Sequence, residues 1–301
     1  MDSLLDSLGR PNTEHAERNP KTYIERICVS SANERATALV RATSCCSIVA
    51  SYVYVRMRRR VAAAAKRMMK KKSGSKKRRK LNVLCLHGWR TNGDILRMQL
   101  RDVIRDNRED VGFTFINAPF KAKGPPQDIV GKIWPPDKFK YYEWWDRVDD
   151  RYEGLERSIQ YIVQANEEYG PFQGILGFSQ GAALASIVCK KKILDTLYFG
   201  ALFSGFVPRD RDLRVLFSKK SDSNVPLFLS AGERDADYCK KALQDFPKTF
   251  AKDSCVVANH SGGHELPLKT NGGSGALLSL RSFISEVGCT RKEEGTHRGK
   301  I

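Results

Sequence analysis

The segment Gly177-Phe178-Ser179-Gln180-Gly181 places a serine between two glycines, in the pattern Gly-x-Ser-x-Gly. A serine in this setting attacks a carbonyl carbon when a neighbouring base takes its proton, so the chemistry indicated is acyl transfer. The pattern alone is common, but here an apolar run precedes it and a helix-forming run follows it. That context predicts a tight strand-to-helix turn with the serine at its tip, where the helix field favours developing negative charge.

A serine hydroxyl is a weak nucleophile, so a histidine base must lie within reach. In strand–turn–helix sites of this kind the base follows the serine, which leaves His260, His264 and His297 of the chain's five histidines. His297 lies in a polar tail, and His260 directly ends a predicted strand, where a loop-stabilising role fits better. His264 follows the turn at Gly262-Gly263, from which it can reach across to the serine, and we favour it as the base.

An acidic side chain should orient that histidine and should follow the preceding strand, predicted over Val225–Ala231. Three acidic residues lie in the next loop. Asp235 is the favoured partner of the histidine. Asp237 is a second candidate, and it fits the N-cap of the following helix as well as it fits the role of the acid. Glu233 is the third candidate. The choice between Asp235 and Asp237 stays open at this point.

An oxyanion site needs two backbone N–H donors. One should belong to Gln180, the residue after the nucleophile, and the other to Trp89, in the loop that follows the first predicted strand. Gly88 permits close approach of that loop. His87 precedes the serine and ends a strand, so we expect it to hydrogen-bond within the loop rather than act as the base.

These residues need a scaffold, and from Leu81 onward short apolar runs alternate with amphipathic segments. The alternation predicts an α/β fold with a mostly parallel central sheet and helices on both faces. Strands are predicted over 81–87, 111–118, 172–178, 199–206, 225–231 and 254–259. Helices are predicted over 94–106, 152–169, 180–189, 237–250 and 275–287. Two stretches, 120–150 and 208–224, break the alternation and are predicted to be irregular loops of the binding or lid type.

Length and composition divide the chain into an extension over 1–80, one globular domain over 81–288 and a flexible tail over 289–301. The formal net charge of the chain is +18. Residues 56–80 contain fourteen basic residues and no acidic one, so they carry +14 of this charge. The globular body is therefore only weakly basic, and no specific nucleic-acid binding is expected from it. None of the eight cysteines forms a Cys-x-x-Cys pair, which predicts reduced, mostly buried thiols rather than a disulfide framework or a zinc site.

The extension has few large apolar residues, and their spacing shows no sustained helical or strand period. We therefore expect it to be disordered, with a helix over 56–72 as the exception. Its basic run from Lys70 to Lys80 fits a nuclear-localisation or anionic-surface segment as well as it fits a solvated linker. A start at Met68 or Met69, with the preceding residues as a leader, is a further alternative.

No secretory signal opens the chain, because Asp2 and Asp6 stand where basic residues are needed. The longest uncharged stretch of the extension, Ala42 to Val55, has 14 residues, whereas a spanning helix needs about 20. The expected location is the cytoplasm, the nucleus or both, and membrane contact is not expected. The alternative is membrane association through the extension, for example by acylation of Cys45-Cys46.

Residues 81–288 resemble the family of serine hydrolases (FSH, the ovarian-cancer-associated-2-like esterases) of the α/β-hydrolase superfamily. The segments that carry the resemblance, in the family's order, are 86–93, 141–146, 177–181, 204–206, 232–235 and 262–267. The Gly-Phe-Ser-Gln-Gly core is also similar to that of acyl-protein thioesterases and carboxylesterases. Residues 1–80 match nothing in the family pattern.

The resemblance implies an α/β-hydrolase fold and a carboxylesterase-type enzyme that cleaves small-molecule acyl esters, in some members with long chains. It also implies a triad of Ser179, His264 and Asp235 that works through an acyl-enzyme without metal or organic cofactor. The aromatic residues Trp134, Tyr141, Tyr142, Trp144 and Trp145 are candidates for the wall of an acyl pocket. Two alternatives stay open, namely an acyl-thioesterase and a non-catalytic scaffold that binds an anionic partner through residues 56–80.

Overall fold

The computed structural model describes residues 80–220, 223, 225–250 and 254–297. The predicted disordered extension, its helix over 56–72 and nearly all of its basic run lie outside this range. Those features, the three domain boundaries and the cytoplasmic or nuclear location therefore stay predictions. None of the helices within the described range has the length and apolar character needed to cross a membrane.

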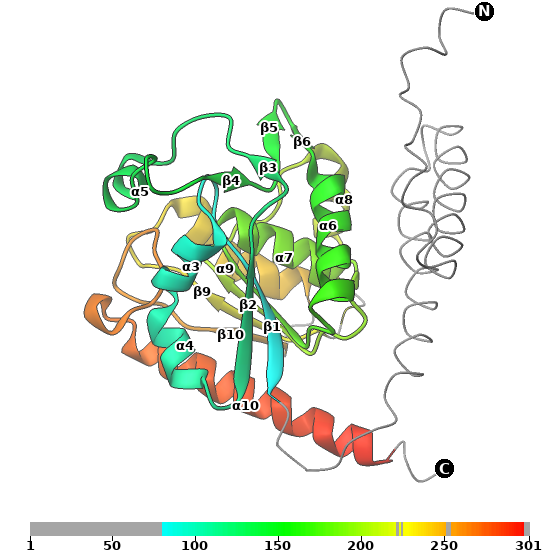
Figure 1. Cartoon of the computed structure of the whole chain (residues 1–301). Coiled ribbons are helices and arrows are strands. Elements are labelled where there is room, and N and C mark those ends of the chain that lie inside the picture. The colour runs from blue at the N-terminus through cyan, green and yellow to red at the C-terminus, as the bar shows by residue number, and fades with distance from the viewer. Residues whose placement is uncertain (1–79, 221–222, 224, 251–253, 298–301) are drawn as a thin grey trace, which may run out of the picture. The chain divides into compact units, whose positions relative to one another are not determined.

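Among the described residues, six parallel strands form the central sheet (Figure 1). In spatial order they are β2 (Val111–Ile116), β1 (Leu81–Leu86), β7 (Gly174–Phe178), β8 (Phe199–Phe203), β9 (Leu227–Ser230) and β10 (Cys255–Val257). β1 comes first in the chain but lies between β2 and β7, so the winding of the sheet reverses there. In open parallel sheets ligands bind beyond the carboxyl ends of the strands at such a reversal.

Helices cover both faces of this sheet, which is why β7, β8 and β9 are fully buried and, apart from Ser230, contain no polar side chain. On one face Leu176 and Phe178 of β7 join an apolar core with side chains of α3, α4 and α10. On the other face Gly177 lies against α7, which is buried along its whole length. The helices are α3 (Gly93–Gln99), α4 (Arg101–Asn107), α5 (Asp128–Ile133), α6 (Leu155–Glu168), α7 (Gln180–Lys190), α8 (Arg211–Ser218), α9 (Asp237–Thr249) and α10 (Ser274–His297).

The predicted α/β architecture, a mostly parallel sheet with helices on both faces, is confirmed, with differences at several element boundaries. The helix expected over 94–106 is divided at Leu100 into α3 and α4. α6 begins at Leu155 rather than at Tyr152, because residues 151–153 form β6 (Arg151–Glu153) and pair with β5 (Asp146–Val148). α10 continues to His297, ten residues beyond the expected end, so part of the stretch expected as a flexible tail is helical.

Two helices lie where irregular loops were expected, α5 in the stretch 120–150 and α8 in the stretch 208–224. α8 occupies much of the charged stretch 208–224, and its N-terminus is capped by Asp210, whose Oδ1 accepts hydrogen bonds from the N–H groups of Asp212 and Leu213. Leu213 and Phe217 are its buried residues. Leu213, Leu216 and Phe217 fall on one helical face, but a helix of eight residues spans only about two turns, which is too short for the pattern to stand out in a stretch this rich in charge. The other stretch, 120–150, holds α5 and the short strands β3 (Phe120–Lys121), β4 (Tyr142–Glu143) and β5.

Gly181 allows α7 to begin directly against the end of β1, and Gly181→Ala should destabilise the fold. A Cβ at this position would overlap the carbonyl oxygens of Leu86 and His87, which are backbone atoms that cannot rotate away. We expect a loss of at least about 3 kcal/mol in the free energy of unfolding, or no folded protein. Gly275→Ala is the matched control, because nothing lies within 4 Å of a Cβ there, and it should stabilise α10 by up to about 1 kcal/mol. Urea unfolding measures both, and equal stability of the two variants would contradict the expectation.

Candidate active site

Ser179 lies at the turn between β7 and α7, where the backbone adopts φ 53° and ψ −115°. Positive φ is costly for a residue with a side chain, and such strain persists only where the surroundings enforce it. Here the N–H of Ser179 donates to the carbonyl oxygen of Phe203 at 2.9 Å, and the carbonyl of Ser179 accepts from Ala183 in α7 at 3.1 Å. The backbone of Ser179 is thus hydrogen-bonded to β8 on one side and to α7 on the other. These bonds fix its hydroxyl at the tip of the turn.

A row of two hydrogen bonds starts at this hydroxyl. Nε2 of His264 lies 2.9 Å from Oγ of Ser179, and Nδ1 of His264 lies 2.8 Å from Oδ1 of Asp235. A carboxylate only accepts hydrogen bonds, so Nδ1 carries the imidazole proton and Nε2 presents a lone pair to the serine hydroxyl. This arrangement can pass the hydroxyl proton to the imidazole while the carboxylate stabilises the resulting cation.

The electrostatics of Asp235 suit that role. Burial alone would raise its pKa, but the hydrogen bond and charge of His264, the nearby Ser204 hydroxyl and the backbone N–H of Ala236 outweigh burial and hold the pKa below its usual value. The N–H of Ala236 reaches Oδ1 at 2.6 Å. Asp235 therefore stays ionised next to the imidazole although it is only 4% exposed.

The competing candidates lie elsewhere. Asp237 is fully exposed and pairs with Lys240 at 2.9 Å, and the N-cap of α9 is Ala236, so the capping role considered for Asp237 was wrong by one residue. Glu233 is exposed in the same loop. His260 is buried and its Nδ1 accepts the N–H of Gly262, a contact that stabilises its own loop. The structure thus brings together Ser179, His264 and Asp235 and leaves these three residues apart from them.

The loop after β1 is held in one orientation by His87. Its Nε2 accepts the N–H of Ala118 at 2.9 Å, so its proton is on Nδ1, which contacts the carbonyl oxygen of Gly88 at 2.8 Å. Because N–H and C=O point in opposite directions across a trans peptide, fixing the oxygen of Gly88 also fixes the N–H of Trp89. No hydrogen bond between described residues uses the N–H of Trp89 or of Gln180. Both donors remain available to an anion beside Ser179.

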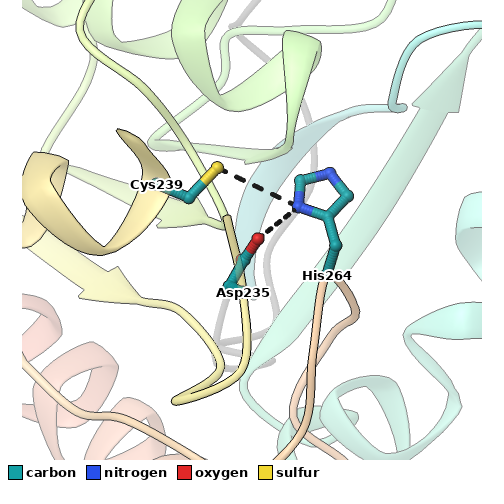
Figure 2. A group of neighbouring side chains, drawn as sticks. All are labelled: Asp235, Cys239 and His264. Atoms are coloured by element: carbon teal, nitrogen blue, oxygen red, sulfur yellow. Dashed lines mark hydrogen bonds and ion pairs between the residues drawn. The ribbon is translucent and has the colours of Figure 1, made fainter. Parts of the chain in front are cut away.

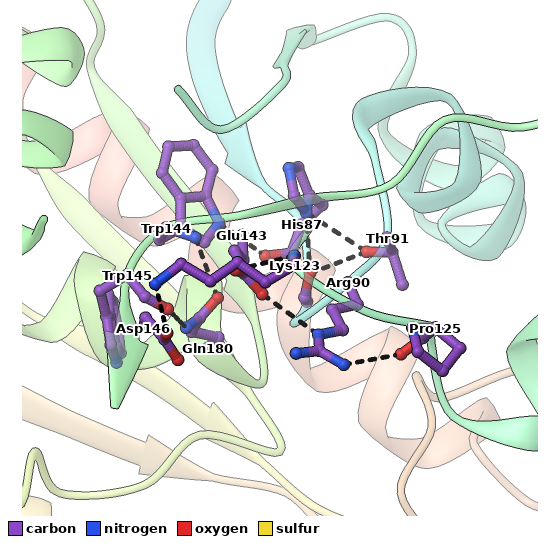
Figure 3. A network of polar contacts seen from close by, with 11 residues as sticks. His87, Arg90, Thr91, Lys123, Pro125, Glu143, Trp144, Trp145, Asp146 and Gln180 are labelled. Atoms are coloured by element: carbon purple, nitrogen blue, oxygen red, sulfur yellow. Dashed lines mark hydrogen bonds and ion pairs between the residues drawn. The ribbon is translucent and has the colours of Figure 1, made fainter. Parts of the chain in front are cut away.

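Figure 3 shows the hydrogen bonds that connect the loop carrying Trp89 with the turn at Gln180. The side chain of Gln180 accepts the N–H of Trp144 at 3.1 Å and donates to the carbonyl of Trp145 at 2.9 Å, and Nε1 of Trp144 donates to the carbonyl of His87 at 2.9 Å. Trp144 therefore bridges the turn at Gln180 and the loop that carries Trp89. Sequence reasoning assigned Trp144 to a pocket wall and missed this bridge, because no local pattern relates residues 57 and 36 positions apart.

A half-buried ion pair secures the same network. Arg90 approaches Oε2 of Glu143 at 3.2 Å, donates to the carbonyl of Pro125 and stacks over the ring of Trp89 at 4.2 Å. Glu143 is 1% exposed, and its other oxygen accepts the N–H of Lys123. The segment 120–146, which holds α5 and the short strands β3 and β4, is thereby fastened to the loop after β1 and forms a structured wall of the site.

Burial lowers the pKa of His87 from 6.5 to about 4. Between these values the unfolded chain binds a proton that the folded protein does not, so His87 contributes full stability above pH 6.5 and loses it as the pH falls toward 4. The free energy of unfolding should fall by about 3 kcal/mol between pH 6.5 and 4. His87→Gln, which removes the titrating group, should flatten this part of the stability–pH curve in urea unfolding between pH 4 and 7. Parallel curves for the two proteins would contradict the assignment.

A pocket of about 470 Å³ opens at Ser179 and His264. Its walls are largely apolar and come from α5, the residues after His264 and the ends of β7 and α3. Trp134 lines it, whereas Trp144 and Trp145 are buried and Tyr141 and Tyr142 are not among its lining residues, so the expected aromatic wall is mostly wrong. The apolar side chains of the lining are Trp89, Met98, Ile129, Val130, Ile133, Trp134, Phe178, Leu266 and Leu268.

Comparisons with known proteins identify the family of this chain. The family model Serine hydrolase (FSH1) matches residues 76–272. The chain is 30% identical over 202 residues to Esterase CG5412 of Drosophila melanogaster, covering 62% of this chain and 69% of that protein. It is 30% identical over 217 residues to Rhodanese-like domain-containing protein 6 of Arabidopsis thaliana, covering 64% of this chain and only 37% of that protein.

Among solved structures, esterase PE8 is 22% identical, with a TM-score of 0.47 and coverage of 69% of this chain and 93% of that one. The family model spans more than half of the chain, and the predicted resemblance is confirmed. This chain belongs to the FSH1 family of serine hydrolases.

Proposed function

We propose that this protein hydrolyses carboxylic esters of apolar acyl groups through an acyl-enzyme on Ser179. The observation that carries the proposal is the continuous row of hydrogen bonds from Ser179 through His264 to Asp235, whose serine end opens into an apolar pocket. A buried, ionised carboxylate at one end and an accessible hydroxyl at the other are what proton transfer in acyl transfer requires.

In the proposed mechanism His264 takes the proton of Ser179 as its oxygen attacks the ester carbonyl. The N–H groups of Trp89 and Gln180 bind the oxyanion of the tetrahedral intermediate. His264 then gives its proton to the leaving alcohol, and a water molecule, deprotonated by the same histidine, releases the acid from Ser179. Asp235 stays ionised throughout and holds the imidazole in the required tautomer.

The pocket supports an apolar acyl group as the part of the substrate that is recognised. Its volume of about 470 Å³ lies in the range of small-molecule sites, which are lined by apolar side chains with a few polar groups. Ile129 and Ile133 of α5 and Met98 of α3 line it although they are more than a third exposed. An acyl chain lying against them removes apolar surface of both partners from water, at about 25 cal/mol per Å².

The test is to label the full chain with a fluorophosphonate probe and to measure turnover of p-nitrophenyl esters from short to long acyl chains. Labelling with turnover, and a rate that rises with chain length until the pocket is filled, is the expected result. Matched oxygen and thiol esters in the same assay decide between an esterase and a thioesterase. No labelling of folded protein would overturn the proposal and favour a non-catalytic role.

Trp144→Phe should lower kcat more than it raises KM. The substitution keeps an aromatic ring but removes the Nε1 donor to the carbonyl of His87, so the loop carrying Trp89 loses a constraint. Donors to the oxyanion act mainly in the transition state, and we expect kcat to fall about 10- to 100-fold with KM changed less than about threefold.

Trp145→Phe is the matched control, because the Trp145 ring stacks on Tyr152 at 4.8 Å and the Trp145 contact with Gln180 uses only its backbone carbonyl. Its kcat should stay within about threefold of the unsubstituted protein. An increase in KM without a fall in kcat, or an equal fall in kcat in both variants, would show that Trp144 does not position the N–H groups of Trp89 and Gln180.

A further inference from the structure

Cys239 lies directly behind the hydrogen-bonded pair of Asp235 and His264. Its Sγ is 3.9 Å from Nδ1 of His264, the atom that also contacts Asp235, and one ligand atom from each of the three residues lies within 4.8 Å of the others (Figure 2). Cys239 is in the first turn of α9 and is fully buried. The mechanism proposed above gives it no role.

The three donors form a ligand set of sulfur, imidazole nitrogen and carboxylate oxygen. These are the ligand types of tetrahedral zinc sites, with bond lengths of about 2.3 Å to sulfur and about 2.0–2.2 Å to nitrogen and oxygen. Tetrahedral angles at those lengths separate sulfur from nitrogen by about 3.6 Å and nitrogen from oxygen by about 3.3 Å. The distances of 3.9 Å and 2.8 Å between these atoms are therefore each about half an ångström or less from a zinc geometry.

A second observation points to a ligand at the same place. Oδ2 of Asp235 is buried and accepts no hydrogen bond of good geometry from a described residue, although the Ser204 hydroxyl and the Cys239 thiol lie close enough to the carboxylate to affect its charge. A buried carboxylate oxygen without a well-formed hydrogen bond is costly and is a natural metal ligand. Access is provided by His264, whose side chain is 25% exposed at the pocket and follows the glycines at 262 and 263.

We propose that Zn²⁺ binds to Asp235, Cys239 and Nδ1 of His264 and reversibly inhibits the enzyme. The inhibition rests on the proposed function, whereas the binding does not. Zinc displaces the Nδ1 proton, which moves to Nε2, and the thiol proton leaves to solvent as the zinc–sulfur bond forms. Nε2 then has no lone pair with which to accept the proton of Ser179, so acyl transfer stops until the metal is removed.

Without metal the thiol is a protonated hydrogen-bond donor. Burial raises the pKa of Cys239 to about 12, and its Sγ contacts the carbonyl oxygen of Ser204 at 3.3 Å. The thiol is therefore not expected to react with alkylating reagents, and the metal supplies the charge that stabilises a thiolate there.

The test is a ZnCl₂ titration of ester hydrolysis by the full chain, reversed with EDTA, for the unsubstituted protein, Cys239→Ser and Cys255→Ser. Each rate is divided by that variant's own metal-free rate. We expect Cys239→Ser to raise the inhibition constant at least about tenfold. Cys255→Ser, which changes a thiol on β10 outside the cluster, should leave it unchanged. Cys239→Ala, which removes the sulfur without placing a hydroxyl in the buried site, replaces Cys239→Ser if circular dichroism shows that the latter is unfolded.

Cobalt gives a readout that needs no activity. Binding of Co²⁺ through the Cys239 thiolate should produce a near-ultraviolet sulfur-to-cobalt charge-transfer band. The band should persist in Ser179→Ala, because Ser179 is not a ligand, and should be absent from Cys239→Ser. If the protein hydrolyses no ester but shows this band, the proposed function fails and the metal site stands. Zinc inhibition of equal strength in Cys239→Ser, or no Cys239-dependent band, would overturn the site.

Discussion

Ser179→Ala should lower kcat/KM for p-nitrophenyl esters by a factor of at least about 10⁴ and abolish fluorophosphonate labelling. The expected loss is large because the acyl-enzyme cannot form without the serine oxygen, and water attack assisted only by Trp89 and Gln180 is slow. The substitution removes a hydroxyl that lies at a pocket and makes no cap hydrogen bond to α7. The free energy of unfolding should therefore change by less than about 1 kcal/mol.

Ser186→Ala is the matched control for this result. Ser186 is a buried serine of the same helix, and its hydroxyl donates to the carbonyl of Ala183 at 2.7 Å. Its loss should cost about 1 kcal/mol of stability and leave kcat within about threefold. Turnover by Ser179→Ala within tenfold of the unsubstituted protein would exclude Ser179 as the nucleophile.

Asp235→Asn should lower kcat by about 10³- to 10⁴-fold with little change in KM. The asparagine amide can donate to Nδ1 of His264, which moves the imidazole proton to Nε2 and removes the lone pair that faces Ser179. The side chain keeps its size, but the amide nitrogen that faces His264 takes the place of Oδ1, so the N–H of Ala236 loses its acceptor. We expect that loss to cost about 1–3 kcal/mol of stability. The loss of kcat is measured by steady-state kinetics on protein that circular dichroism shows to be folded.

Asp237→Asn makes the same chemical change two residues away, on a side chain that is fully exposed. It breaks a surface ion pair with Lys240, which is worth little in water, and kcat should stay within about twofold. A larger loss in Asp237→Asn than in Asp235→Asn would reverse the assignment of the acid.

Three residues with side chains adopt positive φ near the site, namely Ser179, Ser204 and Arg90. Ser179 and Ser204 directly follow β7 and β8 at the same edge of the sheet, and Arg90 belongs to the loop after β1. Each is held by hydrogen bonds of its own: Ser179 and Ser204 by the backbones of neighbouring strands, and Arg90 by Glu143 and Pro125. Strained backbone of this kind, enforced by the sheet, holds catalytic groups in place before a substrate binds.

The sequence by itself determined the features whose causes are local. The spacing of Gly177, Ser179 and Gly181 specifies the strand-to-helix turn, because only small residues avoid the backbone atoms that meet there. Continuous apolar runs specify a sheet buried on both faces, and the order of serine and histidines reduced the candidate bases to three. α5 and α8 were missed and α3 and α4 were merged, because helices this short span only about two turns and carry a weak periodic signal.

Only the tertiary structure decided which distant side chains meet. It separated His264 from His260 and Asp235 from Asp237, pairs that lie four and two residues apart but point into different surroundings. It also disclosed the bridge from Trp144 to Gln180 and His87, and the position of Cys239 behind Asp235 and His264. The physical reason is that hydrogen bonds between residues 25 to 85 positions apart depend on how strands and helices pack, and no short-range pattern records that packing.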